Sequence, residues 1–142
     1  MSTFGHNEPK LVSLLGDTAV FALPGGGRVT FTGRAQGNMS SVGGEGAEHG
    51  LEARERLRTT LGMQRLVRGY QVHGTVVGRV LADGEHLERG SNAFKCQDSA
   101  NQPTFEADGH ALAAPGLAAM VLTADCIPVA LGAQGAVAAL HA

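Results

Sequence analysis

Residues 121–128 read Val-Leu-Thr-Ala-Asp-Cys-Ile-Pro, and this stretch joins an apolar run to residues that can take part in chemistry. The opening Val-Leu pair is predicted to end a buried strand, because it leads directly into polar residues. Asp125 and Cys126 then lie where the strand gives way to a turn. Pro128 has no N–H to donate and is expected to stop regular strand pairing. A thiol beside a carboxylate at a strand end is therefore placed for chemistry as well as for packing.

Two other apolar runs end in a histidine. Gln71-Val72-His73-Gly74 closes one of them, and the run from Ala136 to Leu140 is followed by His141. Zinc takes imidazole and thiolate ligands in tetrahedral geometry, and a catalytic zinc site keeps its fourth position open. No CxxC or HxxxH spacing is present, which excludes a zinc finger. From spacing alone, ordinary half-buried residues at strand ends are the commoner explanation of His73, Cys126 and His141.

The composition is that of a globular chain of about one domain, with 142 residues of which 43% are hydrophobic. Aromatic residues make up only 4% and Trp is absent, so small side chains must pack closely in the core. The net charge of −2 and the lack of a basic block argue against a nucleic-acid partner.

Several features of the sequence favour the cytoplasm. The N-terminal residues contain neither the basic nor the apolar region of a signal peptide. No apolar run reaches the roughly 18 residues that a membrane helix needs. Two cysteines do not make a disulfide framework, which favours a reducing compartment. We therefore expect a soluble cytoplasmic protein without a membrane partner.

Short apolar runs separated by glycine and other turn residues predict a series of strands. They are Leu11–Leu15, Ala19–Leu23, Val29–Thr32, Leu66–Val72, Thr75–Leu81, Ala118–Thr123, Ile127–Leu131 and Ala136–Leu140. Gly16-Asp17 suits a hairpin turn between the first two. The polar segments 33–50 and 83–107 are predicted to be loops.

One helix is predicted over Leu51–Leu61. Ala53, Leu57 and Leu61 recur there at four-residue spacing and form a single apolar stripe. Gly62 is suited to end the helix.

Arg34 stands at the start of the first long loop, directly after the strand predicted at Val29–Thr32. A guanidinium group in that place could hold an anion. From its position alone, an ordinary exposed arginine is the favoured interpretation.

A set of motifs resembles the laccase-domain family, which is also called the multicopper polyphenol oxidase-like family. The motifs are Phe31-Thr32-Gly33-Arg34, Arg54 on the predicted helix, Gln71-Val72-His73-Gly74, Ala107-Asp108-Gly109 before Pro115-Gly116, Thr123-Ala124-Asp125-Cys126-Ile127-Pro128, and the final Val-Ala-Ala-Leu-His-Ala. The resemblance runs from about residue 28 to the last residue. The pair of QVHG and TADCxP, in this order and separation, is its most specific part.

The resemblance implies an α/β fold of α+β-like character, with a mixed β-sheet and flanking helices, over a single domain at 1–142. Family members continue with Gly-Trp-Arg-Gly after His141 and its alanine, so we expect a fold that is incomplete at the C-terminus. Free sheet edges favour self-association or a complementing C-terminal portion. The loop after Arg34 is shorter than in the family, which puts that wall of the substrate site in doubt.

The resemblance also implies an activity, because bacterial members are mostly described as broad-specificity purine nucleoside phosphorylases. Their reactions are phosphorolysis of adenosine, inosine, guanosine and methylthioadenosine, and deamination of adenosine. His73, Cys126 and His141 would bind one zinc ion and form the catalytic centre. Arg34 would bind phosphate, because a guanidinium suits bidentate oxyanion binding. Asp125 would orient a histidine or, equally, cap the turn.

Three alternatives remain open. A copper oxidase acting on phenols fits the older family name, and blue-copper sites also use two His and one Cys. However, none of the six histidines forms the HxH pairs of a multicopper enzyme. A cysteine hydrolase or amidase of cell-wall peptides would use Cys126 as nucleophile and His73 as base. The last alternative is a catalytically inert fragment.

Overall fold

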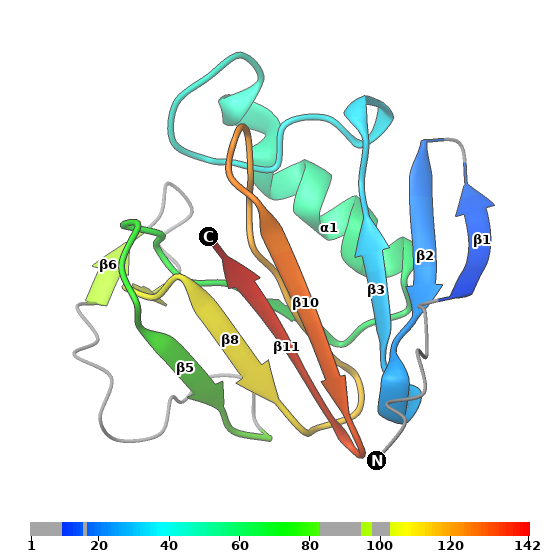
Figure 1. Ribbon diagram of the computed structural model, residues 1–142. Coiled ribbons are helices and arrows are strands. Elements are labelled where there is room, and N and C mark those ends of the chain that lie inside the picture. Colours follow the sequence, from blue (N-terminus) through cyan, green and yellow to red (C-terminus); the bar gives the residue numbers. More distant parts are fainter. Residues whose placement is uncertain (1–9, 16, 83–94, 98–102) are drawn as a thin grey trace.

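The computed structural model describes residues 10–15, 17–82, 95–97 and 103–142. Within these ranges the chain forms β-sheets and one α-helix, which places it in the expected α+β class (Figure 1). None of the helices in the described ranges is long and apolar enough to cross a membrane.

The N-terminal sheet is an antiparallel meander of β1 (Lys10–Leu15), β2 (Thr18–Ala22) and β3 (Arg28–Phe31). The predicted hairpin and third strand are thus confirmed, although Gly16 of the turn lies outside the described residues. A short 3-10 turn, η1 (Pro24–Gly26), joins β2 to β3. Gly25 has a positive φ of 83°, and a Cβ there would collide with the backbone of Ala133. This turn therefore packs closely against the second sheet.

The second sheet is mixed and has the strand order β10 (Pro128–Ala133), β11 (Ala136–His141), β8 (Gly109–Leu112), β5 (Val77–Val80). β10, β11 and β8 pair antiparallel, and β5 pairs parallel to β8. Figure 1 shows β11 between β10 and β8, with its last residues close to the start of β8. The mixed sheet expected for the fold is confirmed.

A second layer covers one face of the mixed sheet. It contains the parallel pair β4 (Arg65–Val67) and β9 (Leu117–Ala119). Val67, Val80, Leu112 and Leu117 form the buried core between the layers, with Val137 packed against them. The core thus uses branched aliphatic side chains, as the low aromatic content requires. The structure also contains β6 (Lys95–Gln97) paired with β7 (Pro103–Phe105), and the 3-10 turns η2 (Arg34–Gln36) and η3 (Ala47–His49).

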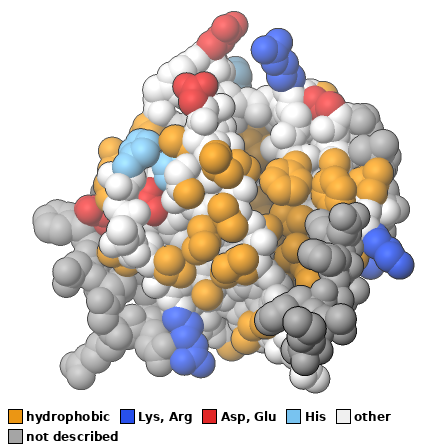
Figure 2. Space-filling view, in the orientation of Figure 1, with side chains coloured by type: hydrophobic (Ala, Val, Ile, Leu, Met, Phe, Trp, Pro, Cys, Tyr) orange, Lys and Arg blue, Asp and Glu red, His pale blue; other side chains and the backbone are white. Residues whose placement is uncertain are grey.

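The opposite face of the mixed sheet is largely apolar and partly exposed. Figure 2 shows hydrophobic side chains gathered over β10, β11 and β8. Leu131 on β10 and Val77 on β5 are 53% and 49% exposed. The self-association or complementing portion expected from the sequence stays a prediction, and this face is where it would be sought.

The helix α1 (Gly50–Thr60) lies within one residue of its predicted bounds at each end. Ala53 on the predicted stripe is buried, and Gly62, with φ of 67°, follows the helix as expected. Arg54 is also buried, and its Nη1 donates a hydrogen bond of 2.7 Å to the carbonyl of Met39. The helix therefore holds the glycine-rich loop that precedes it.

Five expectations about the strands are wrong. No strand is predicted from the sequence at β8 (Gly109–Leu112), which lies inside the mixed sheet. β4 ends at Val67 and β9 at Ala119, so the apolar residues that follow them lie in loops. Pro128 begins β10 rather than ending pairing, because β10 is an edge strand, where proline is tolerated at the first position. β6 and β7 interrupt the loop predicted at 83–107, of which 83–94 and 98–102 lie outside the described residues.

His110 on β8 is only 1% exposed, and its cross-strand partners are the small residues Gly78 and Ala139. Neither ring nitrogen has a hydrogen-bond partner among the described residues. Burial lowers the pKa of His110 from 6.5 to about 4, although the nearby charge of Asp108 favours the protonated form. The imidazole is therefore neutral at pH 7.

This burial predicts a pH-dependent stability. The unfolded chain binds a proton at His110 below about pH 6.5 and the folded chain does not, so stability is present above that pH and is lost as the pH falls toward 4. Between pH 7 and pH 5 this group should cost about 2 kcal/mol of unfolding free energy. Urea unfolding of His110→Leu should lack this loss, whereas His49→Gln, at an exposed histidine, should retain it. Equal pH dependence in all three chains would contradict the assignment.

Candidate metal centre

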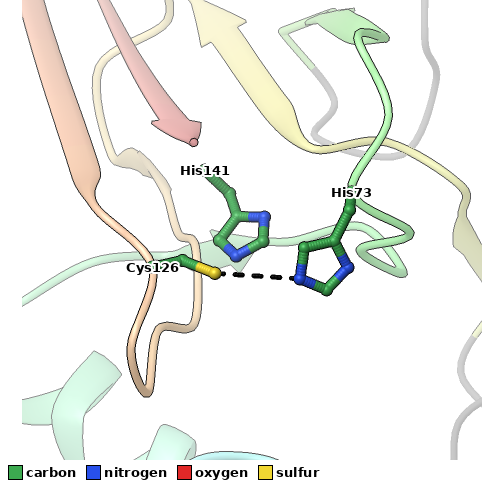
Figure 3. A group of neighbouring side chains, drawn as sticks. All are labelled: His73, Cys126 and His141. Atoms are coloured by element: carbon green, nitrogen blue, oxygen red, sulfur yellow. Dashed lines mark hydrogen bonds between the residues drawn. The ribbon is translucent and has the colours of Figure 1, made fainter.

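Three side chains far apart in the sequence converge at one end of the mixed sheet. One ligand atom from each of His73, Cys126 and His141 lies within 4.8 Å of the other two (Figure 3). Cys126 Sγ is 3.7 Å from His73 Nε2, and the two imidazole centroids are 5.0 Å apart. Only His141 ends a strand, since His73 lies in the loop after β4 and Cys126 in the loop between β9 and β10. The candidate residues therefore come together, although two of them do so from loops.

The carboxylate of Asp108, one residue before β8, holds both histidines. Oδ2 accepts hydrogen bonds from the amides of Val72 and Gly74, at 3.2 and 2.8 Å. Oδ1 accepts the amide of His73 at 2.9 Å and lies 3.0 Å from Nδ1 of His141. The amide of His141 also donates to the carbonyl of Asp108, at 2.7 Å. One residue thus connects the His73 loop to the end of β11.

Neighbouring hydrogen-bond donors stabilise the ionised form of the Asp108 carboxylate. Burial alone would raise the pKa of its carboxyl group, but hydrogen bonds from the Gly74 amide, the His141 imidazole and the Val72 and His73 amides together hold that pKa below its usual 3.8. Asp108 is only 3% exposed, so these donors replace the water that an ionised carboxylate would otherwise need.

The contact with Asp108 also assigns the tautomer of His141. A carboxylate can only accept, so Nδ1 of His141 carries a proton, and in the neutral imidazole the lone pair is then on Nε2. His73 presents its own Nε2 toward the sulfur of Cys126. Both imidazoles therefore offer Nε2 to the space between the three side chains.

His73 is the one non-glycine residue in the described ranges with a positive φ, at 59°. This conformation costs an L-residue roughly 1–2 kcal/mol. The three consecutive amides bound by Asp108 surround this residue and hold the loop in place. Strain of this kind is commonly found at functional sites.

Asp125, which we expected either to orient a histidine or to cap the turn, is exposed. In the part of the chain that the structure describes, it makes no hydrogen bond to either imidazole. The carboxylate in contact with His141 is Asp108 instead. The one feature of the sequence that pointed to Asp108 was the Ala107-Asp108-Gly109 motif. Its contacts with His73 and His141 could not be predicted, because most of its hydrogen-bond donors are backbone amides, which every residue type except proline has.

The three side chains line a broad cleft of about 1520 Å³, which also contains Arg34. The edge strands β3 and β10 form parts of its walls, and the glycine-rich loop at 37–45 forms another. Phe31 and Tyr70, which are 40% and 41% exposed, also line the cleft. The volume exceeds the roughly 300–1000 Å³ of a typical ligand pocket, so a small molecule and an anion can share it.

Two side-chain acceptors fix the backbone on either side of Arg34. The carboxylate of Asp17 accepts the amide of Ala35 at 2.9 Å, and Gln36 Oε1 accepts the amide of Gly33 at 2.7 Å. A Cβ at Gly33 would collide with the side chain of Asp17, which explains a glycine before the arginine. The Arg34 side chain itself is exposed.

The donor set suits a zinc ion, and the ligand pair of His73 and Cys126 has the spacing of zinc ligands. Zinc bonds of about 2.0–2.1 Å to nitrogen and 2.3 Å to sulfur, at a tetrahedral angle, put two such ligand atoms about 3.6 Å apart. Nε2 of His73 and Sγ of Cys126 are 3.7 Å apart. The imidazole and thiol donors suit a borderline-soft cation, and three protein ligands leave one position open.

Replacing Asp108 by Asn tests whether this carboxylate holds the site. An amide cannot accept from all four donors, so metal-free Asp108→Asn should lose about 1–3 kcal/mol of unfolding free energy. Asp125→Asn is the matched control and should change stability by less than about 0.5 kcal/mol. Urea unfolding with a chelator present measures both, and an Asp108 variant as stable as the wild type would contradict the assignment.

Comparison with known proteins gives one match. A family model described as multi-copper polyphenol oxidoreductase laccase covers residues 22–142, a range that includes His73, Cys126, His141 and Arg34. No curated protein and no solved structure matches the chain. The chain belongs to the multi-copper polyphenol oxidoreductase laccase family.

Proposed function

We propose that the chain binds one zinc ion through His73, Cys126 and His141 and acts on purine nucleosides. The reactions are phosphorolysis of adenosine, inosine, guanosine and methylthioadenosine, and deamination of adenosine. The observation that carries this proposal is the convergence of the three ligand atoms within 4.8 Å in a cleft that also contains Arg34.

Zinc, when bound, supplies a Lewis acid and lowers the pKa of water at its open position to about 7. The protein's own contribution is to keep the three donors in place. Asp108 keeps the proton of His141 on Nδ1, so that Nε2 can donate its lone pair. Cys126 is held as a thiolate when it coordinates a metal. A reducing cytoplasm would protect that thiolate, which supports this localisation as part of the proposal.

Two exposed aromatic rings support a purine substrate. Tyr70 lies three residues before His73, and Phe31 is at the end of β3, both in the cleft. Stacking of a base on an aromatic side chain contributes about 1–3 kcal/mol. The chain has only six aromatic residues, so the exposure of two in one cleft is best explained by a planar ligand.

Arg34 is the candidate for the phosphate. Its guanidinium can bind two oxygens of an oxyanion at once. In phosphorolysis the phosphate attacks the ribose C1′ as the base departs, so the arginine must hold it beside the sugar. Arg68 also lines the cleft, with its Nη2 3.3 Å from Ser41 Oγ, and adds positive charge to it.

The alternatives have less support. A copper site would use the same three donors, but no HxH pair exists for a multicopper centre. The contact between Cys126 and His73 would suit a cysteine hydrolase. However, a catalytic base is usually oriented by a third group, and the carboxylate of Asp108 contacts the other imidazole, that of His141.

Metal content and activity test the proposal together. The purified chain should contain close to one zinc per molecule and convert adenosine plus phosphate to adenine, or adenosine to inosine. Cys126→Ser should weaken zinc binding at least about 100-fold, because loss of even an outer partner costs 10- to 100-fold. Bound copper together with oxygen uptake would favour the copper oxidase. Activity that needs no zinc and is lost when the cysteine is alkylated would favour the cysteine hydrolase. No metal and no product would favour the inert fragment.

Arg34→Gln tests the phosphate site separately. The KM for phosphate should rise at least about tenfold, because a charged hydrogen-bonding partner is worth about 1.5–3 kcal/mol. The rate of adenosine deamination, which uses no phosphate, should change little. Arg28→Gln, at an exposed arginine of β3 that does not line the cleft, is the matched control. An unchanged KM for phosphate in the Arg34 variant would remove this residue from the proposal.

A further inference from the structure

The side chain of Gln71 pairs with the backbone of Leu122 as a neighbouring strand would. Its Nε2 donates to the carbonyl of Leu122 at 2.7 Å, and its Oε1 accepts the amide of the same residue at 2.7 Å. Leu122 lies three residues past the end of β9, where backbone pairing with β4 has ended. The carboxamide thus replaces a missing strand at that point.

The loop that carries Cys126 is consequently fixed at two points. Leu122 is tied to Gln71, which is two residues before His73. At the other end, directly after His141, the amide of Ile127 donates to the carbonyl of Ala142 at 2.8 Å, and the carbonyl of Ile127 accepts from the amide of Ala142 at 3.0 Å. Each attachment therefore relates the cysteine to a different histidine.

We propose that Gln71 is a positioning residue that sets the separation of Cys126 from His73. This inference rests on the proposed metal site. Of the two attachments, the one at Ile127 is made by backbone atoms alone, so Gln71 is the side chain by which the sequence controls the spacing. Without it, the loop keeps its hold beside His141 but loses its hold beside His73, where Sγ and Nε2 lie 3.7 Å apart.

A role in ligand binding is the competing explanation, since Gln71 also lines the cleft. Both polar atoms of its carboxamide are already engaged by Leu122 at short distances. Breaking these bonds to bind a ligand would leave the polar groups of the partly buried Leu122 peptide without a partner, which is unfavourable. The geometry therefore favours an internal role.

Two variants separate the contributions of the carboxamide. Gln71→Leu removes both hydrogen bonds at similar size, whereas Gln71→Glu keeps an acceptor for the Leu122 amide but sets a carboxylate against the Leu122 carbonyl. Gln134→Leu, at an exposed glutamine in the turn between β10 and β11, is the matched control.

Amide hydrogen exchange of the metal-free chain tests the attachment itself. The Leu122 amide should be protected in the wild type and in Gln134→Leu, and should lose at least about tenfold of that protection in Gln71→Leu. An unprotected Leu122 amide in the wild type would overturn the proposal, whatever the metal site does.

Cobalt(II) titration then tests the positioning role. Gln71→Leu and Gln71→Glu should bind cobalt about 10- to 100-fold more weakly than the wild type. Their thiolate-to-cobalt charge-transfer band should weaken relative to the ligand-field bands, a change that a general loss of stability would not produce. Unchanged affinity and band shape in both variants would overturn the inference. Failure of the wild type to bind cobalt or zinc would instead contradict the proposed metal site. Hydrogen exchange of the Leu122 amide would still test the contact between Gln71 and Leu122.

Discussion

The site depends on one buried carboxylate. Asp108 is ionised while almost fully buried, so it must collect hydrogen bonds in place of water. Its donors come from the loop at 72–74 and from the last residue but one of the chain. Satisfying this single charge therefore brings together segments more than 30 residues apart and places both histidines.

The sheet makes this arrangement possible. β8 begins directly after Asp108 and has β5 on one side and β11 on the other, so the carboxylate lies between the two segments that it binds. The third metal-ligand candidate, the thiol of Cys126, is positioned in a different way. Cys126 is carried by a loop, and its place relative to the imidazoles depends on backbone and carboxamide contacts at either end of that loop. Because these contacts, and not strand pairing, fix the thiol, a substitution that breaks one of them is expected to move Cys126 relative to the imidazoles.

The elements with a strong local pattern were predictable from the sequence. The N-terminal hairpin, the strand near Val29 and the strand before His141 are short apolar runs next to glycine, and the helix near Leu51 has an apolar stripe and a glycine after its end. The predicted strand through Val72 was wrong because the amides at 72–74 bind Asp108 instead of a neighbouring strand. Val121 and Leu122 are apolar because they line the cleft, partly buried, rather than because they are paired in a sheet. The meeting of His73, Cys126 and His141 was expected from the family resemblance. Spacing alone could not have given it, because it arises from contacts distant in sequence.

The central claim is that two imidazoles and one thiolate of this chain share a single zinc ion. X-ray absorption at the zinc edge of the loaded protein examines those bonds most directly. The account predicts two nitrogen ligands at about 2.0–2.1 Å and one sulfur at about 2.3 Å, with one further light atom. A coordination shell without sulfur, or one with two or more sulfurs, would contradict it.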